Sequence, residues 1–109
     1  MNKENVMKIV INECFGGFGL SREAVDLYCA EKEINPGKWN DTWKFYEDFH
    51  CRSIERNDPL LVGIVEQLGK KSWGSCAQLK VVDIPDDVEW QINEYDGNEH
   101  VAEVHRRWY

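Results

Sequence analysis

The sequence has 109 residues with 20 acidic and 13 basic side chains, and its formal net charge is −7. A chain of this size fits one domain with a modest core, so we expect a single domain over residues 1–109. An acidic surface repels duplex nucleic acid in general, which excludes general nucleic-acid binding. The chain has no run of about eighteen apolar residues, and residues 1–10 are too polar for a secretory signal. We therefore expect an intracellular protein that does not enter a membrane.

The first part of the chain predicts a strand, a glycine-rich loop and a helix. Residues 8–12 are rich in β-branched residues and are followed by glycines, which favours a buried strand. Ser21 is a good N-cap residue, and an apolar stripe after it predicts a helix that ends near Glu33.

The tryptophan-rich segment, residues 35–56, is the least clear part of the sequence. Its Pro-Gly pair at 36–37 marks a turn. Roughly helical spacing then relates four aromatic residues, which are Trp39, Trp43, Tyr46 and Phe49. We expect a short helix here, followed by a connecting segment.

A second helix and a set of strands are predicted for the remainder. Asp58 and Pro59 form a helix start, and Gly69 is a C-terminal cap. Residues 79–85 predict a strand, and residues 88–93 alternate apolar and polar side chains as in a half-buried strand. Residues 99–108 fit either a helix or a strand, but the preceding Asp-Gly pair at 96–97 favours a returning strand. The fold class expected is α+β, a mainly antiparallel sheet with two or three helices packed on one face.

The glycine loop is the first candidate site. A glycine-rich turn between a strand and a helix N-terminus lets backbone N–H groups approach an anion. The residues expected to touch such a ligand are Cys14, Phe15, Gly16, Gly17, Phe18, Gly19 and Ser21. The pattern is neither G-x-G-x-x-G nor a phosphate-binding P-loop. The alternative is structural: the glycines satisfy a turn that needs positive φ, and Phe15 and Phe18 pack in the core. Both interpretations stay open at this point.

The second candidate is a basic and aromatic cluster near the C-terminus, formed by His105, Arg106, Arg107 and Trp108. Arginine binds phosphate bidentately and tryptophan stacks on bases, so this cluster favours an anionic partner. The alternative is that the two arginines pair with the chain's own carboxylates.

The four cysteines, Cys14, Cys29, Cys51 and Cys76, do not have zinc-site spacing and are expected to be free thiols in or near the core. Cys76 in "GSCA" could act as a nucleophile if His100 or His105 served as its base, but a buried thiol is the simpler interpretation. We assign no catalytic residue, no metal ligand and no cofactor from the sequence.

Four stretches together resemble a known group of proteins: "KIVINECFGGFGLS", "DPLLVGIVEQLG", "GSCAQLKVVDIPDDVEWQINEYDG" and "EVHRRW". They are similar to small uncharacterised proteins encoded by tailed bacteriophages and prophages. Residues 35–56 depart from that family's pattern. The resemblance implies a phage accessory protein in the host cytoplasm, and it supplies no catalytic residues.

The leading functional hypothesis is binding of a small anionic, nucleotide-like ligand without turnover, as in sequestration of a nucleotide signal used in host defence. The alternative is an inhibitor that presents an acidic, aromatic surface to a host protein. A third hypothesis is a small cysteine-dependent enzyme that uses Cys76. Whether the chain forms a homo-oligomer is left open.

Overall fold

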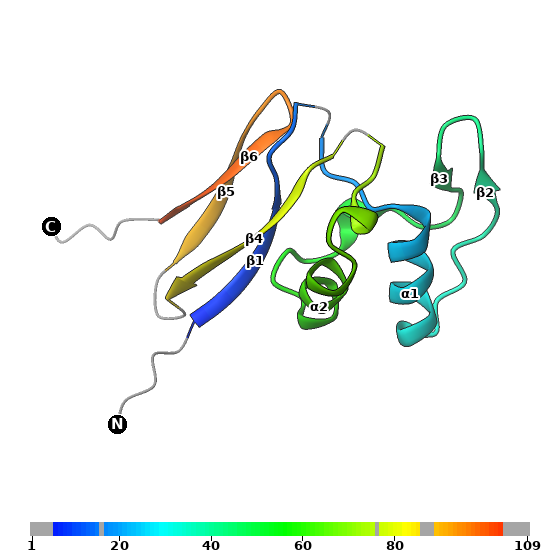
Figure 1. Cartoon of the computed structure of the whole chain (residues 1–109), viewed down its shortest axis with the longest axis horizontal. Helices are drawn as coiled ribbons and strands as arrows, with labels where there is room; N and C mark the ends of the chain where they lie inside the picture. The colour runs from blue at the N-terminus through cyan, green and yellow to red at the C-terminus, as the bar shows by residue number, and fades with distance from the viewer. Residues whose placement is uncertain (1–5, 16, 76, 86–88, 104–109) are drawn as a thin grey trace, which may run out of the picture.

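The computed structural model describes residues 6–15, 17–75, 77–85 and 89–103 and has an α+β fold (Figure 1). Its elements in chain order are β1 (Val6–Asn12), α1 (Arg22–Lys32), β2 (Trp39–Asn40), β3 (Phe45–Tyr46), α2 (Pro59–Leu68), β4 (Leu79–Pro85), β5 (Trp90–Tyr95) and β6 (Asn98–Glu103). Single turns of 3-10 helix lie at Cys51–Ser53 and Gly69–Ser72. Within the described residues, no helix has the length and apolar character that a membrane span needs.

The second half of strand β1, residues 9–12, is buried on both of its faces, which explains the apolar run from Ile9 to Ile11. It pairs antiparallel with β4 over its whole length. Val10 faces the main core, which includes both helices, whereas Ile9 and Ile11 belong to a second cluster on the other side. In Figure 1 the two helices lie on one side of β1 and β4, and the hairpin of β5 and β6 lies on the other. Apolar residues at successive positions are therefore all removed from water.

The predicted helix ends are confirmed. The Ser21 hydroxyl accepts a hydrogen bond from the Ala24 N–H (3.1 Å) at the start of α1, and Glu33 ends this helix in the left-handed region. Asp58 accepts a hydrogen bond from the Leu60 N–H (2.9 Å), with proline at the first position of α2. These caps satisfy N–H groups that have no partner within their own helix.

The prediction of a short helix in the tryptophan-rich segment is wrong. Strands β2 and β3 form a small antiparallel hairpin in which Trp39 pairs with Tyr46. The Asn40 side chain accepts a hydrogen bond from the Trp43 N–H (2.9 Å), and Lys44 has φ 59°. A side chain that closes a turn on its own backbone competes with a helix, so local turn formation outweighs the spacing of the aromatic residues.

The C-terminal strands form a hairpin, as the Asp-Gly pair predicted. Asp96 and Gly97 both have positive φ (51° and 90°), the conformation that favours a tight hairpin turn. Residues 98–103 return as β6, which resolves the choice between helix and strand for that part. Trp90, Ile92 and Val101 pack against the Ile9 side of β1. The antiparallel strands thus form three two-stranded units in place of one continuous sheet.

Candidate functional site

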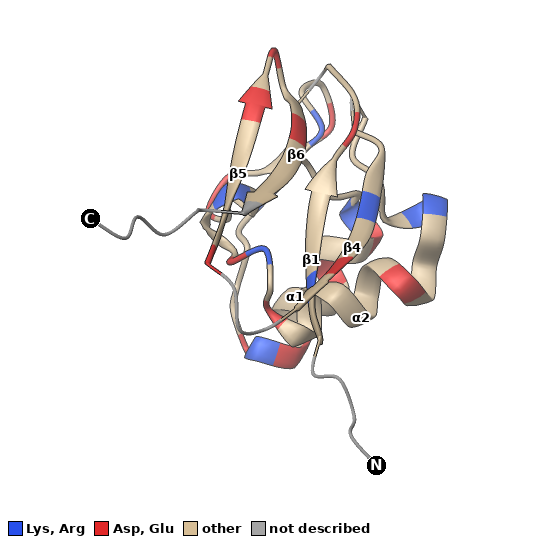
Figure 2. Cartoon of the chain, turned by 90° about the vertical axis from the view of Figure 1, so that its left-hand side faces the viewer, with Lys and Arg blue, Asp and Glu red and all other residues tan. Residues whose placement is uncertain are grey.

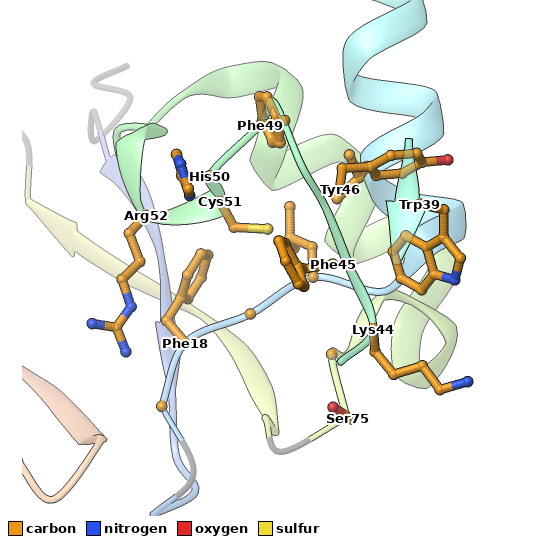
Figure 3. A pocket seen from close by; sticks show the side chains of 15 residues that line it. Phe18, Trp39, Lys44, Phe45, Tyr46, Phe49, His50, Cys51, Arg52 and Ser75 are labelled. Carbon is orange, nitrogen blue, oxygen red and sulfur yellow. The ribbon is translucent and has the colours of Figure 1, made fainter. Parts of the chain in front are cut away.

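A pocket of about 380 Å³ lies between the glycine loop and the tryptophan-rich segment (Figure 3). The glycine loop supplies residues 17–20 to its wall, and the segment from Trp39 to Arg52 supplies most of the rest. Gly74 and Ser75 close one side. The pocket is therefore built by two segments that the sequence analysis treated separately.

The inside of the pocket is mainly aromatic. Phe18 comes from the glycine loop and Phe45 from the tryptophan-rich segment, and Cys51 contributes its thiol to the lining (Figure 3). Trp39 and Tyr46 form the far wall, with ring centres 5.0 Å apart in an edge-to-face arrangement. An edge-to-face pair at this distance packs against itself and gives the pocket a rigid apolar wall.

Two cations flank the pocket from opposite ends. Arg52 lies beyond Phe18, and Lys44 lies beyond Phe45 (Figure 3). Lys44 already pairs with Asp41 at 3.0 Å, and this contact, followed by the hydrogen bond from Trp39, lowers the pKa of the Asp41 carboxyl. No carboxylate of the described residues forms an ion pair with Arg52. The electrostatic character of the two ends therefore differs.

The glycines of the loop allow close backbone packing. Gly17 has φ 98°, and a Cβ there would lie 3.0 Å from Nη2 of Arg52. Gly19 accepts a hydrogen bond from the Gly74 N–H (3.0 Å). A Cβ on Gly97 would lie only 2.5 Å from the backbone nitrogen of Gly17, so the turn of the β5–β6 hairpin presses directly on the loop. The glycines therefore serve the structural role of close backbone packing on one side of the loop. The other side of the loop faces the pocket.

Behind the loop, Asn12 joins three segments through its buried side chain. Its Nδ2 donates to the carbonyls of Cys14 and Gly97 (both 2.7 Å), and its Oδ1 accepts from the N–H of Gln78 (2.8 Å). Its backbone N–H donates to Glu99 (2.9 Å). One asparagine therefore fixes the start of the glycine loop to β4 and to the hairpin.

A buried ion pair continues this network to the pocket wall. Glu99 is only 6% exposed, and both of its oxygens accept hydrogen bonds from the Arg56 guanidinium (2.6 and 2.9 Å). The same guanidinium lies 3.7 Å from the centre of the Phe18 ring. Phe18 therefore has a cation on one side and contributes to the pocket with the rest of its surface.

The predicted site residues separate into three groups. Gly17, Phe18 and Gly19 line the pocket. Ser21 does not line it, because its hydroxyl donates to the Lys71 carbonyl (2.6 Å) while capping α1. Cys14 and Phe15 also lie outside the pocket lining. The Phe15 ring, 63% exposed, stands edge-to-face with Tyr95 at 6.5 Å.

The remaining predicted residues cannot be placed. Gly16, His105, Arg106, Arg107 and Trp108 lie outside the described residues, as does Cys76. Their proposed contributions stay predictions.

Sequence reasoning missed the residues that form most of the pocket. They come from the tryptophan-rich segment: Lys44, Phe45, Phe49, His50, Cys51 and Arg52. The density of aromatic side chains there was a usable signal, but the helix assigned to it gave no reason to bring Phe45 against Phe18. Burial raises the pKa of the Cys51 thiol, which keeps it neutral.

No family model, curated protein or solved structure matches this chain. Residues 6–15, 17–75, 77–85 and 89–103 also contain no group of three or more His, Cys, Asp and Glu side chains able to hold a metal ion.

Proposed function

We propose that the protein binds a small anionic, nucleotide-like ligand in this pocket and does not turn it over. The observation that carries the proposal is an aromatic pocket with an arginine beside a glycine loop, in a chain of net charge −7. Flat aromatic ligands stack on exposed rings such as Phe45, and an arginine provides a bidentate partner for an anionic group.

The size and composition of the pocket support a small ligand. Its volume of about 380 Å³ falls within the range typical of small-molecule sites, which are largely apolar with a few polar groups. Binding without turnover is supported by Cys51, the thiol at the pocket centre, because burial disfavours its nucleophilic thiolate form.

A binding experiment with a matched pair of aromatic variants tests the proposal. Isothermal titration calorimetry against linear and cyclic mononucleotides should find at least one ligand for the wild-type protein. Phe45→Ala should weaken that binding about tenfold or more, the usual effect of losing one stacked base. Phe15→Ala removes an exposed ring outside the pocket and should leave affinity unchanged. Failure of the whole nucleotide panel would reject the proposal.

The resemblance to small proteins of tailed bacteriophages supports a setting for this activity. A phage accessory protein that holds a nucleotide tightly in the host cytoplasm would lower the free concentration of a defence signal. Purified protein added to a nucleotide-dependent host effector should inhibit it in proportion to protein concentration, and excess nucleotide should reverse the inhibition.

A second candidate function is an inhibitor that presents an acidic, aromatic surface to a host protein. Residues 90–103 contain four carboxylates and no lysine or arginine, and Figure 2 shows this acidic hairpin in contrast to the mixed charges of the helices. One of the four, Glu99, is buried against Arg56, so the others supply the acidic surface. Trp43, at the tip of the β2–β3 hairpin, is 75% exposed. For this function, Trp43→Ala should weaken the complex with the host protein, whereas Phe45→Ala in the pocket should not.

A further inference from the structure

We infer that the ligand is a nucleoside monophosphate, or another molecule made of one aromatic base and one phosphate, and that it binds in a single orientation. The phosphate lies at Arg52 beside the glycine loop, and the base stacks on the exposed ring of Phe45. This inference rests on the proposed function and names the ligand class of the same site.

Arg52 is placed to receive the phosphate. One of its terminal nitrogens lies so close to Gly17 that a Cβ there would be 3.0 Å away, so the guanidinium and the loop backbone form one surface. His50 stands at the same end of the pocket (Figure 3). An arginine not engaged by a described carboxylate retains its full capacity for two parallel hydrogen bonds to phosphate.

The loop backbone can add donors at the same place. No described residue accepts a hydrogen bond from the backbone N–H of Phe18 or Gly19. Glycine at positions 17 and 19 leaves the backbone uncovered by side chains on either side of Phe18. Backbone N–H groups in glycine-rich turns are a common phosphate-binding element.

The opposite end of the pocket is not equivalent. Lys44 forms an exposed ion pair with Asp41 at 3.0 Å, whereas no carboxylate of the described residues pairs with Arg52. Arg52 is therefore the better anion partner of the two pocket cations. Between the ends, Phe45 is 41% exposed, whereas Phe18 is only 6% exposed and packs against Arg56. One base can stack on Phe45 with its phosphate directed to Arg52 (Figure 3).

The test measures one arginine variant and one lysine variant, each with a nucleotide and with the same molecule lacking its phosphate. The probes are the four common nucleoside 5′-monophosphates and their nucleosides, measured by calorimetry or by competition. Arg52→Ala should weaken the best monophosphate by about 10- to 100-fold, the usual effect of losing a charged hydrogen bond, and should change its nucleoside by less than threefold. Lys44→Ala, at the opposite end of the pocket, should weaken the monophosphate much less than Arg52→Ala does. Melting temperatures of both variants should stay within a few degrees of wild type, since both side chains are exposed.

The outcomes separate the two proposals. If the wild-type protein binds no nucleotide, the proposed function fails and this inference fails with it. If it binds nucleotides and Arg52→Ala keeps full affinity for the monophosphate, or Lys44→Ala loses as much as Arg52→Ala, the orientation is wrong while the function stands. Equal losses for nucleoside and monophosphate in Arg52→Ala also overturn the inference. Arg52→Lys retains the charge without the fork and should recover part of the monophosphate affinity.

Discussion

The guanidinium carbon of Arg56 lies 3.7 Å from the centre of the Phe18 ring, and the same guanidinium donates two hydrogen bonds to Glu99. The β5–β6 hairpin is thereby connected to the wall of the pocket through one side chain. Because Glu99 also accepts the Asn12 N–H, the same carboxylate fixes the entrance to the glycine loop. The stability of the fold and the shape of the pocket are therefore linked at this point.

Replacing Glu99 should destabilise the protein strongly. Glu99→Ala leaves the half-buried Arg56 charge without its partner, and breaking such a pair costs about 3–5 kcal/mol of the free energy of unfolding. Lys8→Ala is the control, because it removes the exposed Lys8–Glu66 pair (2.9 Å), where the cost should be below about 1 kcal/mol. Urea unfolding followed by tryptophan fluorescence measures both. Equal effects of the two substitutions would show that the buried pair is not a major source of stability.

A pair of glycine substitutions tests the contact between the hairpin turn and the glycine loop. Gly97→Ala places a Cβ 2.5 Å from the backbone nitrogen of Gly17 at a residue with φ 90°, so we expect a loss of stability above about 1 kcal/mol. Gly63 lies inside α2, and a Cβ there would meet nothing within 4 Å. Gly63→Ala should therefore stabilise the protein by about 0.5–1 kcal/mol. If the two substitutions shift the melting temperature in the same direction, this packing is contradicted.

Stability should fall at high pH because of a buried tyrosine. Desolvation, followed by the hydrogen bond that its hydroxyl donates to Asp58 (2.7 Å), raises the pKa of Tyr28 to about 12. A group whose pKa is raised in the folded state stabilises it below the unfolded value of about 10, and this stabilisation is lost between about pH 10 and 12. The loss from Tyr28 is of the order of 2 kcal/mol.

The control for the pH effect is Tyr28→Phe. Tyr46, whose pKa is raised by the hydrogen bond to Asp26, titrates in the same direction and should leave part of the pH dependence in that variant. Urea midpoints between pH 8 and 12 should therefore fall less steeply for Tyr28→Phe than for wild type. Parallel curves for the two proteins would show that Tyr28 ionises as in an unfolded chain.

Local signals in the sequence predicted the parts of the fold that local interactions determine. Ser21, Asp58 and the Asp96–Gly97 pair act on residues within a few positions of themselves, and each did what its residue type favours. The β2–β3 hairpin was missed because its aromatic spacing also fits a helix. The hairpin forms because the Asn40 side chain accepts a hydrogen bond from the backbone of the following turn.

The candidate site could be predicted only in part for a different reason. Gly17, Phe18 and Gly19 were identified from the chemistry of a glycine loop, but their partners come from residues 39–52, which reach the loop only in the folded chain. Arg56 and Glu99 are 43 positions apart, and neither shows a pattern that indicates the other. Contacts of this kind depend on the tertiary arrangement, which periodicity and turn signals do not encode.

The most direct test of the central claim is a nuclear magnetic resonance titration of the ¹⁵N-labelled protein with a nucleoside monophosphate. We expect saturable shifts of the amide signals of residues 17–20 and 44–52, with little change in the acidic β5–β6 hairpin. Saturable shifts confined to the hairpin or to the outer face of α2, or no shift at millimolar ligand, would contradict it.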